Sequence, residues 1–163
     1  MDKLKADLIN LLTENARYDY DKLAKATGKT RTEVERAVEE LEADGVIVKY
    51  SAIINTEKLE NKGVQALIEV KVAPQKLNGF ESYAEEIYHF PEVRSLYLMS
   101  GGFDLAVFVD GKDITDIAKF VAEKLSVIDG ITGVATHFIL KKYKIEGQIA
   151  KRPEEIERQI IQA

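Results

Sequence analysis

The feature that most constrains the fold is a change in the spacing of apolar residues along the chain. In the first part of the chain, up to residue 44, apolar side chains recur at three- and four-residue intervals, as on one face of a helix. Across residues 46–54, and again across residues 64–72, they occupy every second position, which is typical of a strand. The chain has 163 residues and is 45% hydrophobic, which suits one or two domains with real cores. The sequence therefore predicts a helical N-terminal part joined to a part that contains a sheet.

Three helices are expected in the N-terminal part. Asp2 is placed to cap the first helix, and the second helix begins after Asp19. Gly28 then allows the tight turn that leads to the third helix. The inward-facing residues of the first two helices are Leu4, Leu8, Leu11, Leu12, Leu23, Ala24 and Ala26.

The third helix opens with Thr-Arg-Thr-Glu, a capping box in which Thr30 and Glu33 satisfy free backbone amides. Gly45 is positioned to end this helix. The inward stripe of the helix is Val34, Val38 and Leu41. Two helices separated by a glycine turn have the arrangement of a helix-turn-helix, whose second helix enters the major groove of DNA.

The charge of the third helix conflicts with this shape. Residues 30–44 hold two bases, Arg31 and Arg36, against six acids, a net charge of −4. Residues 1–50 hold nine Lys and Arg against eleven Asp and Glu, a net −2, and the full chain carries −5. Proteins that read DNA neutralise its phosphates with Lys and Arg, so no broad basic field favours DNA here. A nucleic-acid site must therefore be local or built by oligomerisation.

Composition narrows the remaining classes of function. The chain has no Cys, which excludes disulfide scaffolds, thiolate metal sites and Cys nucleophiles. Its first residues are charged and no long apolar run follows, so neither a secretory signal nor a transmembrane helix is expected. These features favour a cytoplasmic protein with no membrane partner.

The C-terminal part follows a polar connector at residues 55–62 and reads as strand, helix, strand, strand, helix, strand. The strands are expected near residues 64–72, 93–99, 103–109 and 131–141. The first helix should end at His89-Phe90-Pro91, because the residue before a proline leaves the helical region. The two helices are expected to turn inward Leu77, Phe80, Tyr83, Ala84 and Ile87, and then Ile114, Ile117, Ala118, Val121 and Leu125.

This order predicts a ferredoxin-like βαββαβ unit, so the fold class is α+β: a winged helix-turn-helix domain plus a ferredoxin-like domain. Helices should cover one face of its antiparallel sheet. The other face retains apolar side chains, which favours dimerisation through it. After residue 145 a helical tail is expected, with Pro153 in its first turn and Ile156 and Ile160 on one side.

Several motifs occur together and in order along the chain. The N-terminal set is Arg17, Leu23-Ala24, Gly28, Thr30, Val34, Arg36, Val38, Leu41-Glu42 and Gly45-Val46-Ile47. The C-terminal set is Ser100-Gly101-Gly102-Phe103-Asp104-Leu105 and the last strand from Thr136 to Lys141. Over about residues 2–145 this combination resembles the Lrp/AsnC family, the feast/famine transcription regulators of bacteria and archaea.

The resemblance implies a division of labour along the chain. Residues 1–50 would form the helix-turn-helix DNA-binding domain and residues 51–62 a hinge strand and linker. Residues 63–145 would form the effector-binding and oligomerisation domain, followed by the tail at 146–163. Members of the family form dimers that can assemble into octamers and sense amino acids or related metabolites. The chain departs from the family pattern at Lys29, Ala37, Glu39 and Glu40, where the family more often has Leu or basic residues.

The candidate DNA-binding residues lie at the start of the third helix and beside it. They are Arg17, Lys22, Lys25, Lys29, Thr30, Arg31, Thr32, Glu35 and Arg36. Arg reads guanine in bidentate fashion and Glu accepts from cytosine, so the helix holds usable readers. Arg31 with Glu35 and Arg36 with Glu40 are spaced to pair along the helix. The alternative is a three-helix domain that keeps the shape and binds another protein, or binds DNA only weakly.

The candidate effector-binding residues surround the turn at residues 99–104. They are Met99, Ser100, Gly101, Gly102, Asp104 and Thr136. The two glycines let backbone amides approach a carboxylate, while Asp104 suits an ammonium group, so the pair fits a free amino acid. The alternative is a plain hairpin turn in which Asp104 bonds to a backbone amide.

Catalysis and metal binding have little support in the sequence. His89 and His137 are the only histidines, and no third residue with metal-ligand spacing accompanies them. The chain contains no Walker loop, no Gly-x-Gly-x-x-Gly and no triad motif. We therefore expect no enzyme, no metal and no cofactor beyond an amino-acid effector. Sirohaem decarboxylases share the two-domain design, but residues 94–100 lack the histidine that they place in this region. A metabolite sensor with a vestigial helix-turn-helix is the other alternative.

Overall fold

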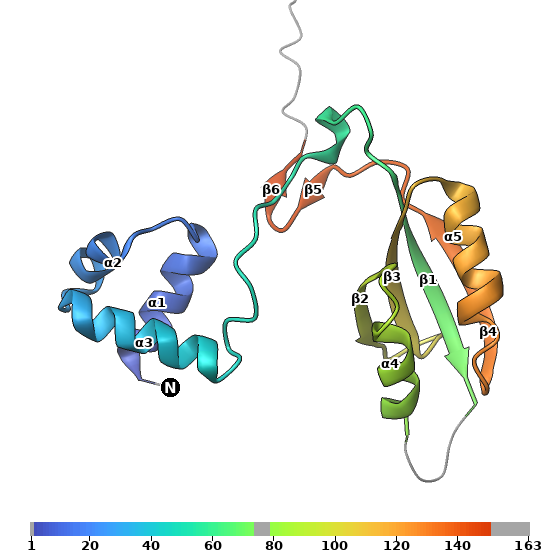
Figure 1. The fold of residues 1–163 in the computed structure, drawn as a ribbon, viewed down its shortest axis with the longest axis horizontal. Helices are drawn as coiled ribbons and strands as arrows, with labels where there is room; N and C mark the ends of the chain where they lie inside the picture. Colours follow the sequence, from blue (N-terminus) through green and yellow to red (C-terminus); the bar gives the residue numbers. More distant parts are fainter. Residues whose placement is uncertain (1, 74–78, 151–163) are drawn as a thin grey trace, which may run out of the picture. The chain divides into compact units, whose positions relative to one another are not determined.

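A computed structural model describes residues 2–73 and 79–150 and divides the chain into two compact units. The first unit is Met1–Ile54 and the second is Asn55–Ala163. Figure 1 labels the elements of each unit along the chain. The helices described are too short and too polar to cross a membrane.

The first unit is a three-helix domain formed by α1 (Lys3–Glu14), α2 (Tyr20–Thr27) and α3 (Arg31–Ala43). The side chains of Asp2 and Asp19 cap α1 and α2 by accepting from backbone amides at 2.8 and 2.7 Å. Gly28 has a φ of 68°, the left-handed value expected of a glycine after a helix. The core consists of Leu8, Leu23, Val34, Ala37, Val38 and Leu41. The three predicted helices, their caps and the glycine turn are confirmed.

The strand expected at residues 46–54 is absent, and that prediction was wrong. The segment leaves α3 through Val46 and Ile47, whose amides both donate to the Leu41 carbonyl, and continues without regular structure. A strand needs a hydrogen-bonded neighbour, and the described residues of one chain provide no strand beside this segment. The alternating apolar pattern therefore does not produce a strand here. Several apolar side chains of the segment are exposed, and Val48 is 90% exposed.

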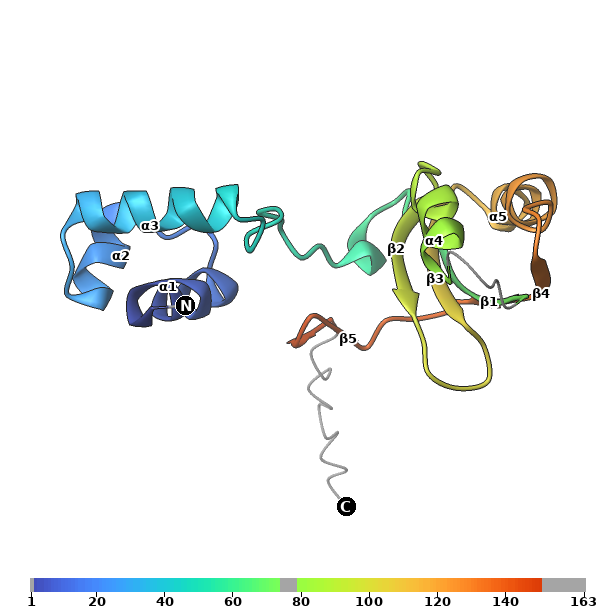
Figure 2. The ribbon, with the colours of Figure 1, turned by 90° about the horizontal axis from the view of Figure 1, so that it is seen from below.

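The second unit is a four-stranded antiparallel sheet with helices on one face (Figures 1 and 2). Its elements are β1 (Val64–Val72), α4 (Glu81–Tyr88), β2 (Val93–Leu98), β3 (Leu105–Gly111), α5 (Ile114–Phe120) and β4 (Ile131–Phe138), with short helical turns η1 (Thr56–Lys58) and η2 (Val121–Leu125). The strand order is β2-β3-β1-β4, which is the ferredoxin-like order predicted from the βαββαβ pattern. The α+β fold class is confirmed.

The pleat of the strands sends alternate residues to the two faces of this sheet. Ala66, Ile68 and Val70 of β1 are fully buried beneath the helices, next to their partners Val109, Val107 and Leu105 of β3. Each helix contributes few residues to this core, with Tyr83 and Ile87 coming from α4. The helix-covered face therefore holds the main core of the unit.

Several boundaries and inward positions differ from expectation. The third strand begins at Leu105 rather than at residue 103, since residues 100–104 form the turn, and the last strand ends at Phe138. Phe80 precedes α4 and is exposed, while Leu77 lies outside the described residues. In the last helix Ile114 and Ala118 are exposed, and Phe120 is buried instead. The π-helical turn η2 follows directly after Phe120 and adds a residue to the turn that leads to the buried Leu125.

A small hairpin follows the sheet and was not predicted. It pairs β5 (Lys144–Ile145) with β6 (Gln148–Ile149). Its two turn residues have positive φ, 44° at Glu146 and 80° at Gly147, as a type I′ turn requires. Such a turn is usually predicted from Asn-Gly or Asp-Gly in the sequence. The turn here has Glu-Gly, so the usual sequence signal is missing. The helical tail expected around Pro153, Ile156 and Ile160 lies outside the described residues.

Candidate functional sites

The N-terminus of α3 carries a complete capping box. The Thr30 amide and hydroxyl donate to Glu33 Oε2 at 2.8 and 2.7 Å, and the Glu33 amide donates to Thr30 Oγ1 at 3.3 Å. The backbone hydrogen bond from Thr30, followed by the bond from its hydroxyl, lowers the pKa of Glu33. Thr30 and Glu33 therefore hold the start of the helix. The hydroxyl of Thr30, proposed from the sequence as a DNA contact, is engaged in this cap.

Arg31 lies between two carboxylates. Its Nε donates to Glu35 Oε1 at 2.8 Å, as the spacing along the helix predicted. Its Nη1 donates to both carboxylate oxygens of Asp21, at 3.2 and 3.1 Å, across the turn from α2. The hydrogen bond to Glu35 and the charge of Asp21 together raise the pKa of Arg31. The guanidinium is exposed yet already has anionic partners.

Arg36 is the more available arginine of α3. Its side chain is 78% exposed and its Nε lies 3.5 Å from Glu40 Oε1, a contact longer than a good hydrogen bond. Glu40 has a closer partner in Lys5 of α1, at 2.9 Å, and that hydrogen bond is the main cause of the lowered pKa of Glu40. Lys5 is thus the main partner of Glu40, and Arg36 is only weakly paired with that carboxylate.

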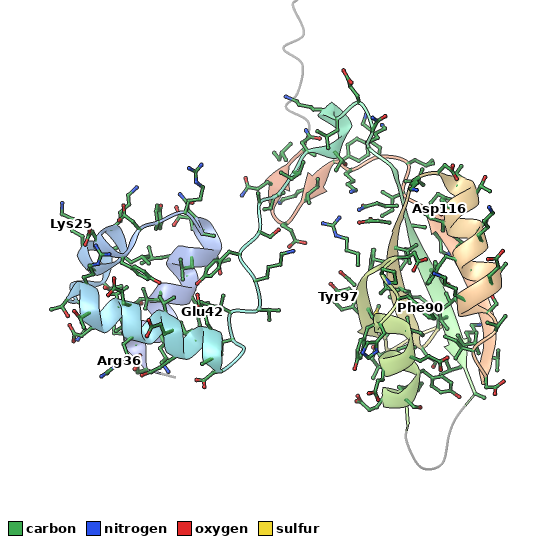
Figure 3. All side chains as sticks on the ribbon, viewed as in Figure 1. Lys25, Arg36, Glu42, Phe90, Tyr97 and Asp116 are labelled. Atoms are coloured by element: carbon green, nitrogen blue, oxygen red, sulfur yellow. The ribbon has the colours of Figure 1, made fainter. Side chains whose placement is uncertain are left out.

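The remaining basic candidates are spread over the first unit. Lys29 lies 3.8 Å from Glu33, and the Lys22 ammonium lies 4.7 Å from the centre of the Tyr18 ring. Arg17 and Lys25 are exposed and form no ion pair within the described part of the chain. Figure 3 shows Lys25 projecting from α2 and Arg36 from α3, away from each other in that view. Lys25 and Arg36 therefore lie on different sides of the first unit in that view.

Glu39 and Glu42 are two further acids in the C-terminal half of α3. Glu42 Oε1 accepts a hydrogen bond of 2.8 Å from the Tyr50 hydroxyl, so this carboxylate is directed to the segment after the helix. Burial, followed by this hydrogen bond, raises the pKa of Tyr50 to about 12. Glu39 is exposed. Glu42 therefore has a structural partner that its sequence position did not indicate.

The turn between β2 and β3 is anchored to β1. Asp104 donates its amide to the Val70 carbonyl at 3.0 Å, and its Oδ2 accepts from the Val72 amide at 2.9 Å. The Met99 amide donates to the Asp104 carbonyl at 2.8 Å and closes the turn. One oxygen of Asp104 thus has the backbone role that the sequence offered as the alternative to ligand binding.

The anchored turn leaves several backbone donors without partners. Among the described residues, the amides of Ser100, Gly101, Gly102 and Phe103 donate no hydrogen bond. Gly101 has a φ of 155°, which a side chain would disfavour, and Met99 beside the turn is exposed. Thr136 lies elsewhere: it pairs with Ile68 in the middle of β1, so one chain does not bring it to the turn.

The face of the sheet opposite the helices carries both aromatic and charged groups. Tyr97 of β2 packs edge-on against Phe108 of β3, with ring centres 6.0 Å apart. His137 of β4 lies across the sheet, with its Nε2 3.3 Å from Glu69 Oε1. These residues occupy alternate positions to the buried core residues, so we call them the open face of the sheet.

Neither histidine belongs to a group of potential metal ligands among the described residues. His89 Nδ1 lies 2.6 Å from the Glu85 carbonyl, one turn earlier in the chain, while His137 lies in β4. Within the described ranges, no three His, Asp or Glu side chains are grouped to hold a metal ion.

Sequence reasoning missed two residues that shape α3 from other helices. Asp21 reaches Arg31 over a ten-residue separation, and Lys5 reaches Glu40 from α1. Neither pair lies at the three- or four-residue spacing that marks neighbours on one helix. No local signal could have revealed them, because helix packing creates both contacts.

Comparison with known families accounts for nearly the whole chain. Residues 1–48 match the family described as winged helix-turn-helix DNA-binding, and residues 65–149 match the Lrp/AsnC ligand binding domain. An uncharacterized HTH-type transcriptional regulator of Bacillus subtilis, YugG, is 41% identical over 96% of this chain and 95% of its own length. The HTH-type transcriptional regulator LrpA of Pyrococcus abyssi is 34% identical, covering 84% of this chain and 94% of that protein.

Solved structures agree with these matches. A transcriptional regulator of Neisseria meningitidis, solved in complex with L-methionine, superposes with a TM-score of 0.70 at 26% identity, covering 89% of this chain and 93% of that one. The leucine response regulatory protein LrpA of Mycobacterium tuberculosis shares the fold, with a TM-score of 0.76 at 20% identity, covering 93% of this chain and 100% of that one. The helix-turn-helix unit and the ferredoxin-like unit occur here in the same order, and this chain belongs to the Lrp/AsnC family of transcriptional regulators.

Proposed function

We propose that this chain regulates transcription by binding specific double-stranded DNA sequences in response to an amino acid or related metabolite, and that it acts as a homo-oligomer. The observation that supports this most is the α2–Gly28–α3 arrangement. It presents a helix whose start is held rigidly by its capping box, while Thr32 and Arg36 are exposed on it. A rigid, exposed second helix is what insertion into a major groove requires.

The proposed contacts divide into two kinds. Thr32, Glu35 and Arg36 would read base edges from α3. Arg31 would contact a base only where the DNA sequence offers a matching one. Phosphate contacts would come from Arg17, Lys22, Lys25 and Lys29. Because few cations are available and several are paired with acids, one site should bind weakly. We expect useful affinity to come from several sites of an oligomer that bind one DNA together.

Selection from random DNA, followed by a salt titration of the selected sequence, tests this function. Specific binding should weaken as salt rises, with a shallow slope. Arg36→Ala should reduce affinity for the selected duplex by about 5-fold or more, the lower end of the discrimination expected of one arginine reader. Lys119→Ala makes the same charge change on exposed α5 and should change it little. If no sequence is enriched at any salt or amino-acid condition, the proposal fails.

The proposed effector site is the turn between β2 and β3. The partnerless amides of residues 100–103 suit a carboxylate, and the second oxygen of Asp104 remains for an ammonium group. Met99 would contact the ligand side chain, and Thr136 would come from another subunit, since β1 separates it from the turn within one chain. The L-methionine complex of the neisserial relative supports an amino acid as the class of ligand.

A charge substitution in the turn gives a matched test of this site. A Cβ at Gly102 would meet no atom within 4 Å, so a substitution there creates no Cβ clash. A thermal-shift screen of the common amino acids should first find a stabilising ligand. Gly102→Asp should then abolish the shift by repelling the ligand carboxylate, whereas the isosteric, neutral Gly102→Asn should retain most of it. Equal shifts in the two variants would contradict this site.

The open face is the proposed dimer interface. Tyr97 is 54% exposed there and Phe108 lies beside it, so a second sheet would cover aromatic surface that one chain leaves open. Tyr97→Glu should shift the protein toward monomers in sedimentation experiments. Tyr88→Glu places the same charge on the equally exposed α4, at 53%, and should leave dimers intact. Octamers would be assemblies of these dimers, and a dimer that survives Tyr97→Glu would exclude this interface.

A second candidate function is a metabolite sensor that binds a protein partner and no longer reads DNA. The observation in its favour is that Arg31 and Lys29 are both paired with acids on a helix of net negative charge. The DNA selection separates the two functions, because the sensor would still respond to its amino acid in the thermal-shift screen while enriching no sequence.

A further inference from the structure

An ion pair joins α2 to α3 at the surface that the function proposed above assigns to DNA binding. Asp21 lies in the first turn of α2 and Arg31 is the first residue of α3, and both carboxylate oxygens of Asp21 lie within 3.2 Å of Arg31 Nη1. Glu35 occupies Nε of the same guanidinium at 2.8 Å. All three side chains reach the surface, with side-chain exposures of 71%, 57% and 36% for Asp21, Arg31 and Glu35. The cluster is therefore open to solvent and does not belong to the core.

These contacts imitate those that a DNA phosphate would make. Phosphate and carboxylate oxygens use the same donors of an arginine. The exposed amides at the start of a helix are a second place where phosphates bind, and here Glu33 already forms the capping box there. The start of α3 thus already carries its own anions. A random phosphate would replace existing carboxylate contacts by contacts of the same kind, so it would gain little from Arg31.

A guanine in the right place offers something different. Two aligned acceptors on one base edge can bind an arginine in bidentate fashion, and such a contact discriminates about 5- to 150-fold between bases. An exposed ion pair is generally worth only about 1.4- to 5-fold in an equilibrium constant. The base contact can therefore displace Asp21, while a single loosely placed phosphate cannot.

On the basis of the DNA-binding function proposed above, we propose that Asp21 is a specificity-determining residue. It holds Arg31 as an intramolecular substitute for a DNA phosphate, so that random DNA is bound without Arg31 and only a matching sequence recruits it. Asp21 would then raise sequence discrimination by lowering affinity for random DNA.

Asp21→Asn tests this role while preserving the shape of the side chain, and Asp19, which caps α2, is left intact. On a random duplex at low salt, Asp21→Asn should bind several-fold more tightly than the native chain, and its salt slope should steepen by about 0.9, the value for one added phosphate contact. Affinity for a selected sequence should rise less, so the ratio of specific to random affinity should fall. Glu123→Gln, the same charge change on exposed η2, should leave both affinities nearly unchanged.

A double-variant cycle shows whether Arg31 carries the gain. Arg31→Ala alone should scarcely alter random-DNA binding, but in the Asp21→Asn background it should remove the gain in affinity and slope. A gain that persists without Arg31 would mean that Asp21 merely repels DNA, and it would overturn the proposal. So would a gain no larger than that of Glu123→Gln. Failure of the native chain to bind any selected sequence would instead contradict the DNA-binding function.

Discussion

The hydroxyl of Tyr50 donates a 2.8 Å hydrogen bond to Glu42 Oε1 and ties the segment after α3 back to the last part of that helix. The bond spans eight residues and passes the glycine that ends α3. It matters because the described part of one chain provides residues 46–54 with no neighbouring strand, and the backbone bonds to the Leu41 carbonyl hold only the start of this segment. Tyr50 thus holds the segment that follows α3 against the end of that helix.

Tyr50→Phe should make residues 46–54 more mobile. Losing one hydrogen bond to a carboxylate at a partly exposed site should lower the free energy of unfolding by up to about 1 kcal/mol. Because the pKa of Tyr50 is raised to about 12, its contribution should be complete below pH 10 and be lost as the pH rises through 12. Amide hydrogen exchange of residues 46–54 should speed up in Tyr50→Phe and stay unchanged in Tyr88→Phe. Unchanged exchange in both variants would contradict the anchoring role.

Thr30→Ala should destabilise the first unit by about 0.5–2 kcal/mol, since it removes the hydroxyl of the capping box. The lowered pKa of Glu33 adds a pH dependence of defined sign. Its contribution should be present above its ordinary pKa of 4.5 and be lost as the pH falls below that value. Glu33→Gln keeps an acceptor that does not titrate, so its melting temperature should fall less between pH 5 and 3 in melts followed by circular dichroism. An acid response identical to that of the native chain would argue against Glu33.

Asp104→Ala should destabilise the second unit by about 1–3 kcal/mol, because the part-buried Val72 amide would lose its acceptor. Asp104→Asn retains a carbonyl oxygen at the same place and should lose less. Ser100→Ala, in the same turn but exposed, serves as the control and should melt like the native chain. Chemical unfolding of the three variants checks the order. If Asp104→Ala were as stable as Ser100→Ala, the turn would not depend on this anchor.

Gly130→Ala should destabilise the second unit by about 1–3 kcal/mol through strain and overpacking. Gly130 has a φ of 87°, and an added Cβ would lie 2.1 Å from the Tyr83 hydroxyl oxygen. That hydroxyl donates to the Ala73 carbonyl at 3.2 Å, so it cannot move away freely. Tyr83→Phe should recover part of the loss in the Gly130→Ala background. Gly133→Ala meets no atom within 4 Å and should unfold at nearly the native denaturant concentration.

The parts of the fold that depend on neighbours in sequence were predictable. The caps at Asp2, Asp19 and Thr30 and the turn at Gly28 need only local hydrogen bonds and backbone preferences. The pairings of Arg31 with Glu35 and of Arg36 with Glu40 follow from one helical turn. The strand order of the second unit followed from the βαββαβ succession, because few arrangements satisfy it.

Failures occurred where a partner outside the local segment decides the outcome. Residues 46–54 alternate like a strand but have no strand to pair with, so period alone could not produce one. In the last helix, packing against the sheet buries Phe120, whereas Ala118, which was expected to face inward, is exposed. Thr136 and the turn around Gly101 were both assigned to the effector site, yet Thr136 lies in β4 and β1 separates it from the turn within one chain.

For the surface of α3, the sequence by itself determined its helical form, its start and its acidity, because these depend on residue types a few positions apart. Only the tertiary structure decided which of these charges have partners outside α3. Packing of α1 and α2 against α3 brings Lys5 to Glu40 and Asp21 to Arg31, and the following segment brings Tyr50 to Glu42. Charge is a property of composition, but the availability of a charge depends on contacts between distant residues. The acidic helix therefore retains Arg36 as its freer arginine while Arg31 is held by Asp21.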